Sequence, residues 1–285
     1  MRIQKQEKVL DQMMSETEKA GRVLEDKHAA QMLRMWEAVK RAMKAVIVQE
    51  YHKDFRKDTW DLATARSRGT LLRIERGTRH IIQTFADASV PFLANVLHHH
   101  TVERKLRLAW MLDQTTPPGI KPKLDGKLVY AERSTAKREA ASPITAGMVQ
   151  MTLGPGAQAA YFERWGMWLG AYQSTLNNNI ALGAMGGSLP DDAAGAVDAA
   201  RPGSPALDMW SIMDRILRTE IIRAQMSAAD GFAEENDELL VTEIWVTRPE
   251  ASASGTCDVC EPLDGLTREE VGGEYQPGFV HPHCR

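Results

Sequence analysis

Cysteine is nearly absent from this 285-residue sequence, which contains three cysteines, none of them before Cys257. So few thiols, gathered in one short segment, do not form the disulfide framework that holds many small secreted proteins together. We therefore expect reduced cysteines, as in a protein that folds inside a cell.

Long apolar runs and common catalytic motifs are also missing. No run approaches the length needed to cross a membrane, and the N-terminal Met1-Arg-Ile-Gln-Lys5 lacks the apolar core of a signal peptide. The sequence contains no Gly-x-Ser-x-Gly elbow, no phosphate-binding P-loop, no His-Glu-x-x-His and no Gly-x-Gly-x-x-Gly. We expect no membrane segment and a function by binding, and we assign no catalytic residue.

What is present suffices for a folded protein of about two domains, since 43% of the residues are hydrophobic and 26% charged. The net charge of −3 is unevenly distributed. Residues 1–115 contain 21 Lys/Arg against 15 Asp/Glu, a net charge of +6, and residues 116–285 contain 14 against 23, a net charge of −9. The basic first part is compatible with DNA or with an acidic protein surface.

Two interpretations of these basic residues stay open. One is a solvated helical surface of mixed sign, the more common case for such a pattern. The other is contact with phosphates, which would make binding steeply dependent on salt. The candidate DNA contacts are Lys53, Arg56, Lys57, Arg66, Arg68, Arg73, Arg76 and Arg79.

Mostly apolar residues recur at helical spacing through residues 1–115, which we predict to be a long amphipathic helical region. Pro91 removes a helical hydrogen bond, so we expect a break or kink there. The stripes, which we expect to pack against one another, comprise Met32, Trp36, Val39, Met43 and Ile47; Leu71, Ile74, Thr78, Ile81, Phe85 and Ala88; and Phe92, Val96, His99, Leu106 and Trp110.

Residues 116–205 are predicted to be a mixed connector. Residues 113–127 are rich in proline and glycine and favour a loop that contains a hairpin. Residues 156–182 predict an aromatic-rich helix, whereas the Ala-, Gly-, Asp- and Pro-rich stretch 183–205 lacks an apolar stripe and is expected to be a mobile loop.

The last segment, residues 206–285, is predicted to be a small mixed domain. Ser204-Pro205 has the residue types of a helix start, Gly231 is expected to end that helix, and residues 239–247 are rich in strand-forming types. The predicted fold class is α+β: a mainly helical N-terminal region followed by this small C-terminal domain.

The cysteines have the spacing of a zinc site. Cys257-Asp-Val-Cys260 is followed, twenty residues later, by His281-Pro-His-Cys284. Three thiolates and one imidazole form a common tetrahedral set for structural Zn²⁺. His281 is the better ligand, because His283 is adjacent to Cys284 and can hardly share a tetrahedral centre with it. The alternatives are three unrelated thiols, or a disulfide between the first two cysteines that leaves the third unpaired.

The residues around the cysteines form an ordered series. It comprises Arg218-Thr-Glu220, Trp245, Cys257-Asp-Val-Cys260-Glu-Pro-Leu-Asp264-Gly265 and His281-Pro-His-Cys284-Arg285. In this order the series resembles the C-terminal domain of the phage Mu F-like minor head proteins, also called phage head morphogenesis proteins. The resemblance covers roughly residues 208–285. Many members of the family continue with Cys-Arg-Cys, whereas this sequence stops at Arg285.

This resemblance implies a minor capsid protein of a tailed bacteriophage. Such a protein would bind at the portal vertex or the inner capsid surface, with the portal protein and the scaffold or major capsid protein as partners. It would reside in the virion after assembly in the host cytoplasm, and some members are thought to leave with the viral DNA. The alternative function is a zinc-stabilised DNA-binding or nuclease-accessory protein. The acidic residues around the predicted zinc site favour the first reading.

Arg218 and Glu220 belong to the family signature, and two roles can be weighed for them. On a helix, Glu220 can pair with Arg223, three positions later. A zinc ion with four protein ligands leaves no water to activate, which argues against catalysis. We therefore expect these charges to hold the helix in place.

Overall fold

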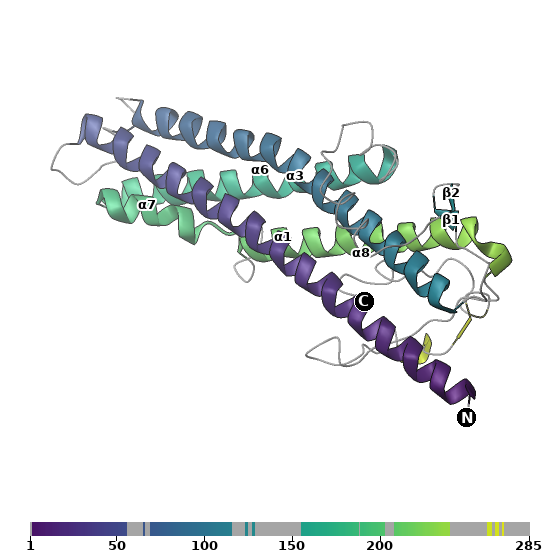
Figure 1. Cartoon of the computed structure of the whole chain (residues 1–285). Helices are drawn as coiled ribbons and strands as arrows, with labels where there is room; N and C mark the ends of the chain where they lie inside the picture. The colour runs from purple at the N-terminus through teal and green to yellow at the C-terminus, as the bar shows by residue number, and fades with distance from the viewer. Residues whose placement is uncertain are drawn as a thin grey trace. The chain divides into compact units, whose positions relative to one another are not determined.

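The computed structural model of the chain describes residues 2–55, 65, 69–115, 123–124, 127–128, 155–187, 189–202, 208–239, 261–263, 266–267 and 270. Long α-helices dominate this part of the chain (Figure 1). The helices are α1 (Arg2–Asp54), α3 (Thr70–Thr115), α6 (Pro155–Met185), α7 (Pro190–Ala199) and α8 (Met209–Glu235). Shorter elements are β1 (Lys123–Leu124), β2 (Lys127–Leu128) and the 3₁₀ turns η1 (Asp237–Leu239) and η3 (Glu261–Leu263).

The predicted α+β class is wrong, because the described part of the chain is mainly helical. Its β1–β2 ladder is a two-residue antiparallel pairing, with Lys123 opposite Leu128, and it provides no sheet for helices to cover. This ladder overlaps the end of the stretch 113–127 in which a hairpin is expected. In the predicted strand 239–247, Leu239 ends a 3₁₀ turn, and residues 240–247 lie outside the described residues.

The chain forms two compact units. Unit 1 comprises Met1–Lys27, Ala94–Leu153 and Arg215–Arg285, and unit 2 comprises His28–Leu93 and Gly154–Asp214. Helices α1, α3 and α8 each contribute residues to both units. The domain boundary predicted after residue 115 borders a stretch outside the described residues, and the boundary predicted after residue 205 lies inside such a stretch. Both boundaries stay predictions.

Unit 2 is built around an aromatic cluster. The ring centroid of Trp36 on α1 lies 5.6 Å from that of Phe85 on α3 and 5.0 Å from that of Tyr172 on α6. Phe85 in turn lies 6.0 Å from Trp165 on α6. These rings are buried, so the three helices meet at one apolar contact. The predicted stripes are confirmed as core at Met32, Trp36, Met43, Ile47, Ile74 and Phe85.

The helix α3 continues through Pro91, so the break expected at this residue is wrong, and the kink given as the other expectation stays a prediction. Proline removes one backbone hydrogen bond, a loss of a few kcal/mol that packing on both sides can offset. Phe85 precedes Pro91 and Leu93, Val96 and Leu97 follow it, and all four are buried.

The mobile loop expected over residues 183–205 is also wrong for its central part, which forms α7. The apolar face of α7 consists of small residues that are buried, namely Ala193, Ala194, Ala196 and Val197. The Tyr172 hydroxyl donates to the Val197 carbonyl oxygen at 2.8 Å, and Lys40 and Lys44 of α1 pair with Asp198. The hydrogen bond from Lys44 lowers the pKa of Asp198. Alanine is only weakly hydrophobic, so a buried face made of alanine is hard to recognise in the sequence as an apolar stripe.

Helix α8 also differs from its predicted bounds. It begins at Met209, where the side chain of Asp208 accepts a hydrogen bond of 2.7 Å from the backbone N–H of Ser211. The predicted start at Ser204-Pro205 lies outside the described residues. The helix continues through Gly231 to Glu235, because the next residue, Phe232, is buried and holds the last turn in place.

In the part of the chain that the structure describes, no helix combines the length and the apolar character needed to span a bilayer.

The first prediction concerns Gly77, where α3 approaches α1. A Cβ atom added at Gly77 would lie 2.7 Å from Cγ1 of Val46, whose β-branched side chain cannot easily move away. Gly77→Ala should therefore lower the free energy of unfolding by about 1–3 kcal/mol, as overpacking does.

The control is Gly170→Ala in α6, where a Cβ would meet nothing within 4 Å. This substitution should stabilise the protein by up to about 1 kcal/mol through helix propensity. Urea unfolding of both variants, and of the double variant Val46→Ala/Gly77→Ala, measures the effect. Equal stability of the two single variants would show that the α1–α3 approach is looser than described.

Candidate functional site

The four predicted zinc ligands, Cys257, Cys260, His281 and Cys284, lie outside the described residues. Within the described ranges, no three His, Cys, Asp or Glu side chains come together in a group that could hold a metal ion. The zinc site therefore stays a prediction from sequence, based on the chemistry of its donor set.

Two residues of the ordered motif series, Arg218 and Glu220, lie on α8 in unit 1. Arg218 reaches across to α1, where its Nη1 donates to Asp26 Oδ1 at 3.1 Å and lies 3.6 Å from Glu25 Oε2. Glu25 is only 5% exposed, so its carboxylate needs a charged neighbour. Arg218 thus connects α8 to a residue of α1 that lies 192 positions earlier in the sequence.

Glu220 is also buried, with an exposed fraction of 5%. Its Oε1 accepts a hydrogen bond of 2.8 Å from Nη1 of Arg223, one helical turn later. The predicted pairing of these two residues is confirmed. Nearby on the same helix, the side-chain amide of Gln225 lies 3.0 Å from Nδ1 of the buried His100 on α3. Polar contacts thus link α8 to both α1 and α3 within unit 1.

The remaining signature residues, Trp245, Asp264 and Gly265, lie outside the described residues. The acidic partners Glu25 and Asp26 were not anticipated, because nothing in the sequence marks them as neighbours of α8. The structure brings them to Arg218 through the packing of helices distant in sequence.

Four of the eight candidate DNA contacts are described, and three of these four are in ion pairs. Arg73 donates to Glu50 at 2.7 Å and also to Asp54, Lys53 pairs with Glu50, and Arg79 pairs with Glu75. Arg76 is exposed. The other four, Arg56, Lys57, Arg66 and Arg68, lie outside the described residues.

These ion pairs partly neutralise the positive charge of Lys53, Arg73 and Arg79, which would otherwise attract phosphate groups. The hydrogen bonds that Arg73 donates to Glu50 and Asp54 also raise the pKa of Arg73, which keeps its guanidinium charged and paired. The arrangement has the features of a solvated surface of mixed sign, and DNA contact stays a prediction.

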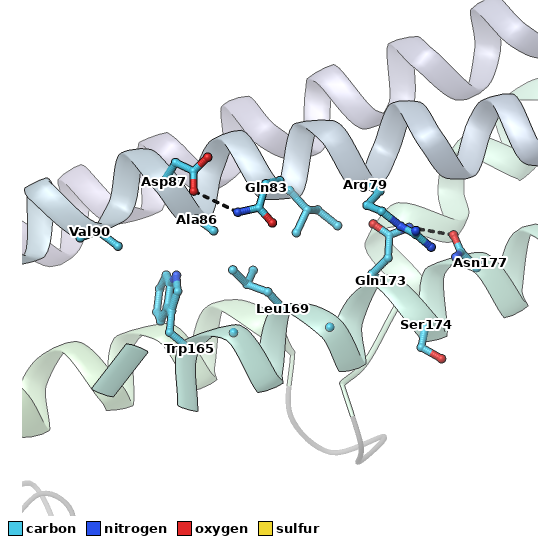
Figure 2. A pocket seen from close by; sticks show the side chains of 13 residues that line it. Arg79, Gln83, Ala86, Asp87, Val90, Trp165, Leu169, Gln173, Ser174 and Asn177 are labelled. Carbon is cyan, nitrogen blue, oxygen red and sulfur yellow. Dashed lines mark hydrogen bonds between the residues drawn. The ribbon is translucent and has the colours of Figure 1, made fainter. Parts of the chain in front are cut away.

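A groove lies between α3 and α6 in unit 2, with a volume of about 630 Å³ (Figure 2). Buried Trp165 and Leu169 of α6 and Ile82 of α3 contribute apolar surface, and Ala86 and Val90 continue the α3 side. Polar groups line it as well: Gln83 and Asp87 on α3, and Gln173, Ser174 and Asn177 on α6.

The α6 side of this groove carries a stripe of small residues, Gly166, Gly170 and Ser174, spaced four apart and exposed. A Cβ atom built on either glycine would meet nothing within 4 Å. The sequence pattern Gly-x-x-x-Gly-x-x-x-Ser could have pointed to this face. The aromatic side chains of residues 156–182 predict a helix there but do not indicate this face.

Comparison of the chain with protein-family models, with curated proteins and with solved structures finds no match.

The second prediction tests the role of Arg218. Arg218→Ala removes the cation beside the buried Glu25 and should lower the free energy of unfolding by about 1–3 kcal/mol. Arg215→Ala, an exposed position on the same helix, should change it by less than about 0.5 kcal/mol. Chemical denaturation followed by circular dichroism compares the two. Equal effects would contradict a stabilising link between α8 and α1.

Proposed function

We propose that this chain is a minor capsid protein of a tailed bacteriophage that acts by binding during head assembly. It would associate with the portal protein at the portal vertex, or with scaffold or major capsid protein at the inner capsid surface. Its place would be the virion, and it would be made in the host cytoplasm. The proposal involves no catalytic step.

The observation that carries this proposal is the ordered series of sequence motifs from Arg218-Thr-Glu220 to His281-Pro-His-Cys284. The side chains of Arg218 and Glu220 support it. Both sit in stabilising contacts within unit 1, as expected of signature residues that maintain a fold. Neither contact resembles a nucleophile beside a general base.

Zinc would have a structural role in this proposal. Three thiolates and the imidazole of His281 would fill the four positions of a tetrahedral Zn²⁺, so no position would remain for a substrate. Metal coordination supplies folding free energy where a short segment buries little surface. The ion would thereby hold residues 257–284 together.

The alternative is a zinc-stabilised DNA-binding or nuclease-accessory protein, which the +6 charge of residues 1–115 favours. Two observations weigh against it. Lys53, Arg73 and Arg79 are paired with carboxylates, and the segment around the cysteines is acidic.

The third prediction tests the metal. Purified wild-type chain should contain about one zinc ion, measured by elemental analysis, because its donor set is a complete tetrahedral one. Cys284→Ser should release this ion and leave the helices of unit 2 as resistant to proteolysis as in the wild type. His283→Ala is the matched control and should keep the zinc. Retention of zinc by Cys284→Ser, or its loss from His283→Ala, would contradict the assigned ligands.

The fourth prediction tests the assembly function. Co-expressed with the portal protein of the same phage genome, the chain should elute with it in size-exclusion chromatography with light scattering. The coat protein of an unrelated phage serves as the control partner. If the two folded proteins elute separately, the portal interaction is wrong. A DNA mobility shift that disappears steeply with salt would then favour the alternative.

A further inference from the structure

The groove between α3 and α6 lies wholly within unit 2, so its geometry depends on neither the zinc site nor the proposed function. Its volume of about 630 Å³ is that of a binding site for a group of side chains or a small molecule. We infer that this groove is a docking site for a basic amphipathic helix of a partner protein. Three features of the groove define that occupant.

The first feature is the small-residue stripe, which fits a helix. Gly166, Gly170 and Ser174 span two turns of α6, about 12 Å at the rise of an α-helix. Nothing lies within 4 Å of a Cβ built on either glycine, so a second helix can approach the α6 backbone closely. Apolar side chains of that helix would lie over Leu169 and against Ala86, as in helix-in-groove recognition.

The second feature is an unused acceptor on Gln173, whose side chain lines the groove although it is only 8% exposed. Its Nε2 donates to Thr78 Oγ1 at 3.1 Å and to Asn177 Oδ1 at 2.8 Å. Its Oε1 is buried and has no hydrogen-bond partner among the described residues. A buried acceptor without a donor destabilises the protein that contains it. An occupant that supplies an N–H donor would satisfy this acceptor.

The third feature is the charge. The charged side chains that line the groove are Arg79 and Asp87. Arg79 is paired with Glu75 on its own helix. Asp87 accepts a hydrogen bond of 3.0 Å from the neutral amide of Gln83 and has no cationic partner in the described part of the chain (Figure 2). The charge that remains to be neutralised is negative, so a complementary helix carries arginine or lysine.

The experiment uses the full-length chain and two fluorescein-labelled synthetic peptides of about 18 residues, long enough to form a helix when bound. Both peptides have a leucine and alanine face. One carries arginines beside this face, and the other has glutamates in their place. By fluorescence anisotropy, the arginine peptide should bind and the glutamate peptide should bind at least about tenfold more weakly.

Variants of the chain show where the peptide binds. Gly170→Leu fills the open space of the groove and should weaken binding of the arginine peptide by at least about tenfold. Gly195→Leu is the matched control, because Gly195 lies on α7 outside the groove, is exposed and also has open space around its Cβ position. It should bind as the wild type does. Asp87→Asn should weaken binding of the arginine peptide and reduce the difference in affinity between the two peptides.

Circular dichroism confirms that each variant folds, and Gly166→Leu replaces Gly170→Leu if the latter does not. Three results would overturn the inference: no binding of the arginine peptide, equal binding of the two peptides, or unchanged binding to the variant with a filled groove. Light scattering provides a further test. A wild-type dimer that Gly170→Leu converts to a monomer would show that a second copy of this chain occupies the groove, which also overturns the inference.

Discussion

The contact of Trp36 with Phe85 and Tyr172 is the interaction on which unit 2 depends. One ring comes from each of α1, α3 and α6, so this contact fixes the three helices against one another. Aromatic pairs of this kind contribute about 0.5–1.5 kcal/mol each beyond the area that they bury. Helix α7 then adds its alanine face beside Tyr172, whose hydroxyl binds the Val197 carbonyl oxygen. Because the hydroxyl is buried, its pKa is raised and it remains a donor.

Trp165, which contacts Phe85 of this cluster, also lines the groove between α3 and α6. Trp165 and Leu169 face inward and pack, whereas Gly166 and Gly170, one position after each, have no side chain to fill the surface between α6 and α3. The groove is therefore a consequence of where glycine falls in the helical period. In its polar wall, Gln173 donates hydrogen bonds within the unit, and its acceptor has no partner among the residues that the structure describes.

In unit 1 an ion pair connects helices α8 and α1, whereas in unit 2 aromatic side chains connect α1, α3 and α6. Glu25 and Glu220 are buried carboxylates, each with an arginine of α8 nearby. Such pairs gain little over an apolar contact, but removing one partner is costly, because the other remains buried and charged. This difference explains why the loss of Arg218 or Arg223 is expected to destabilise unit 1.

The sequence by itself determined the long helices, the buried faces around Trp36 and Ile74, and the pairing of Glu220 with Arg223. All of these follow from spacing along a single helix. Only the tertiary structure decided that α3 continues through Pro91, that α7 forms from an alanine-rich stretch, and that Arg218 meets Glu25 and Asp26. These features depend on free energy from contacts between segments far apart in the sequence, and local propensity does not contain that information.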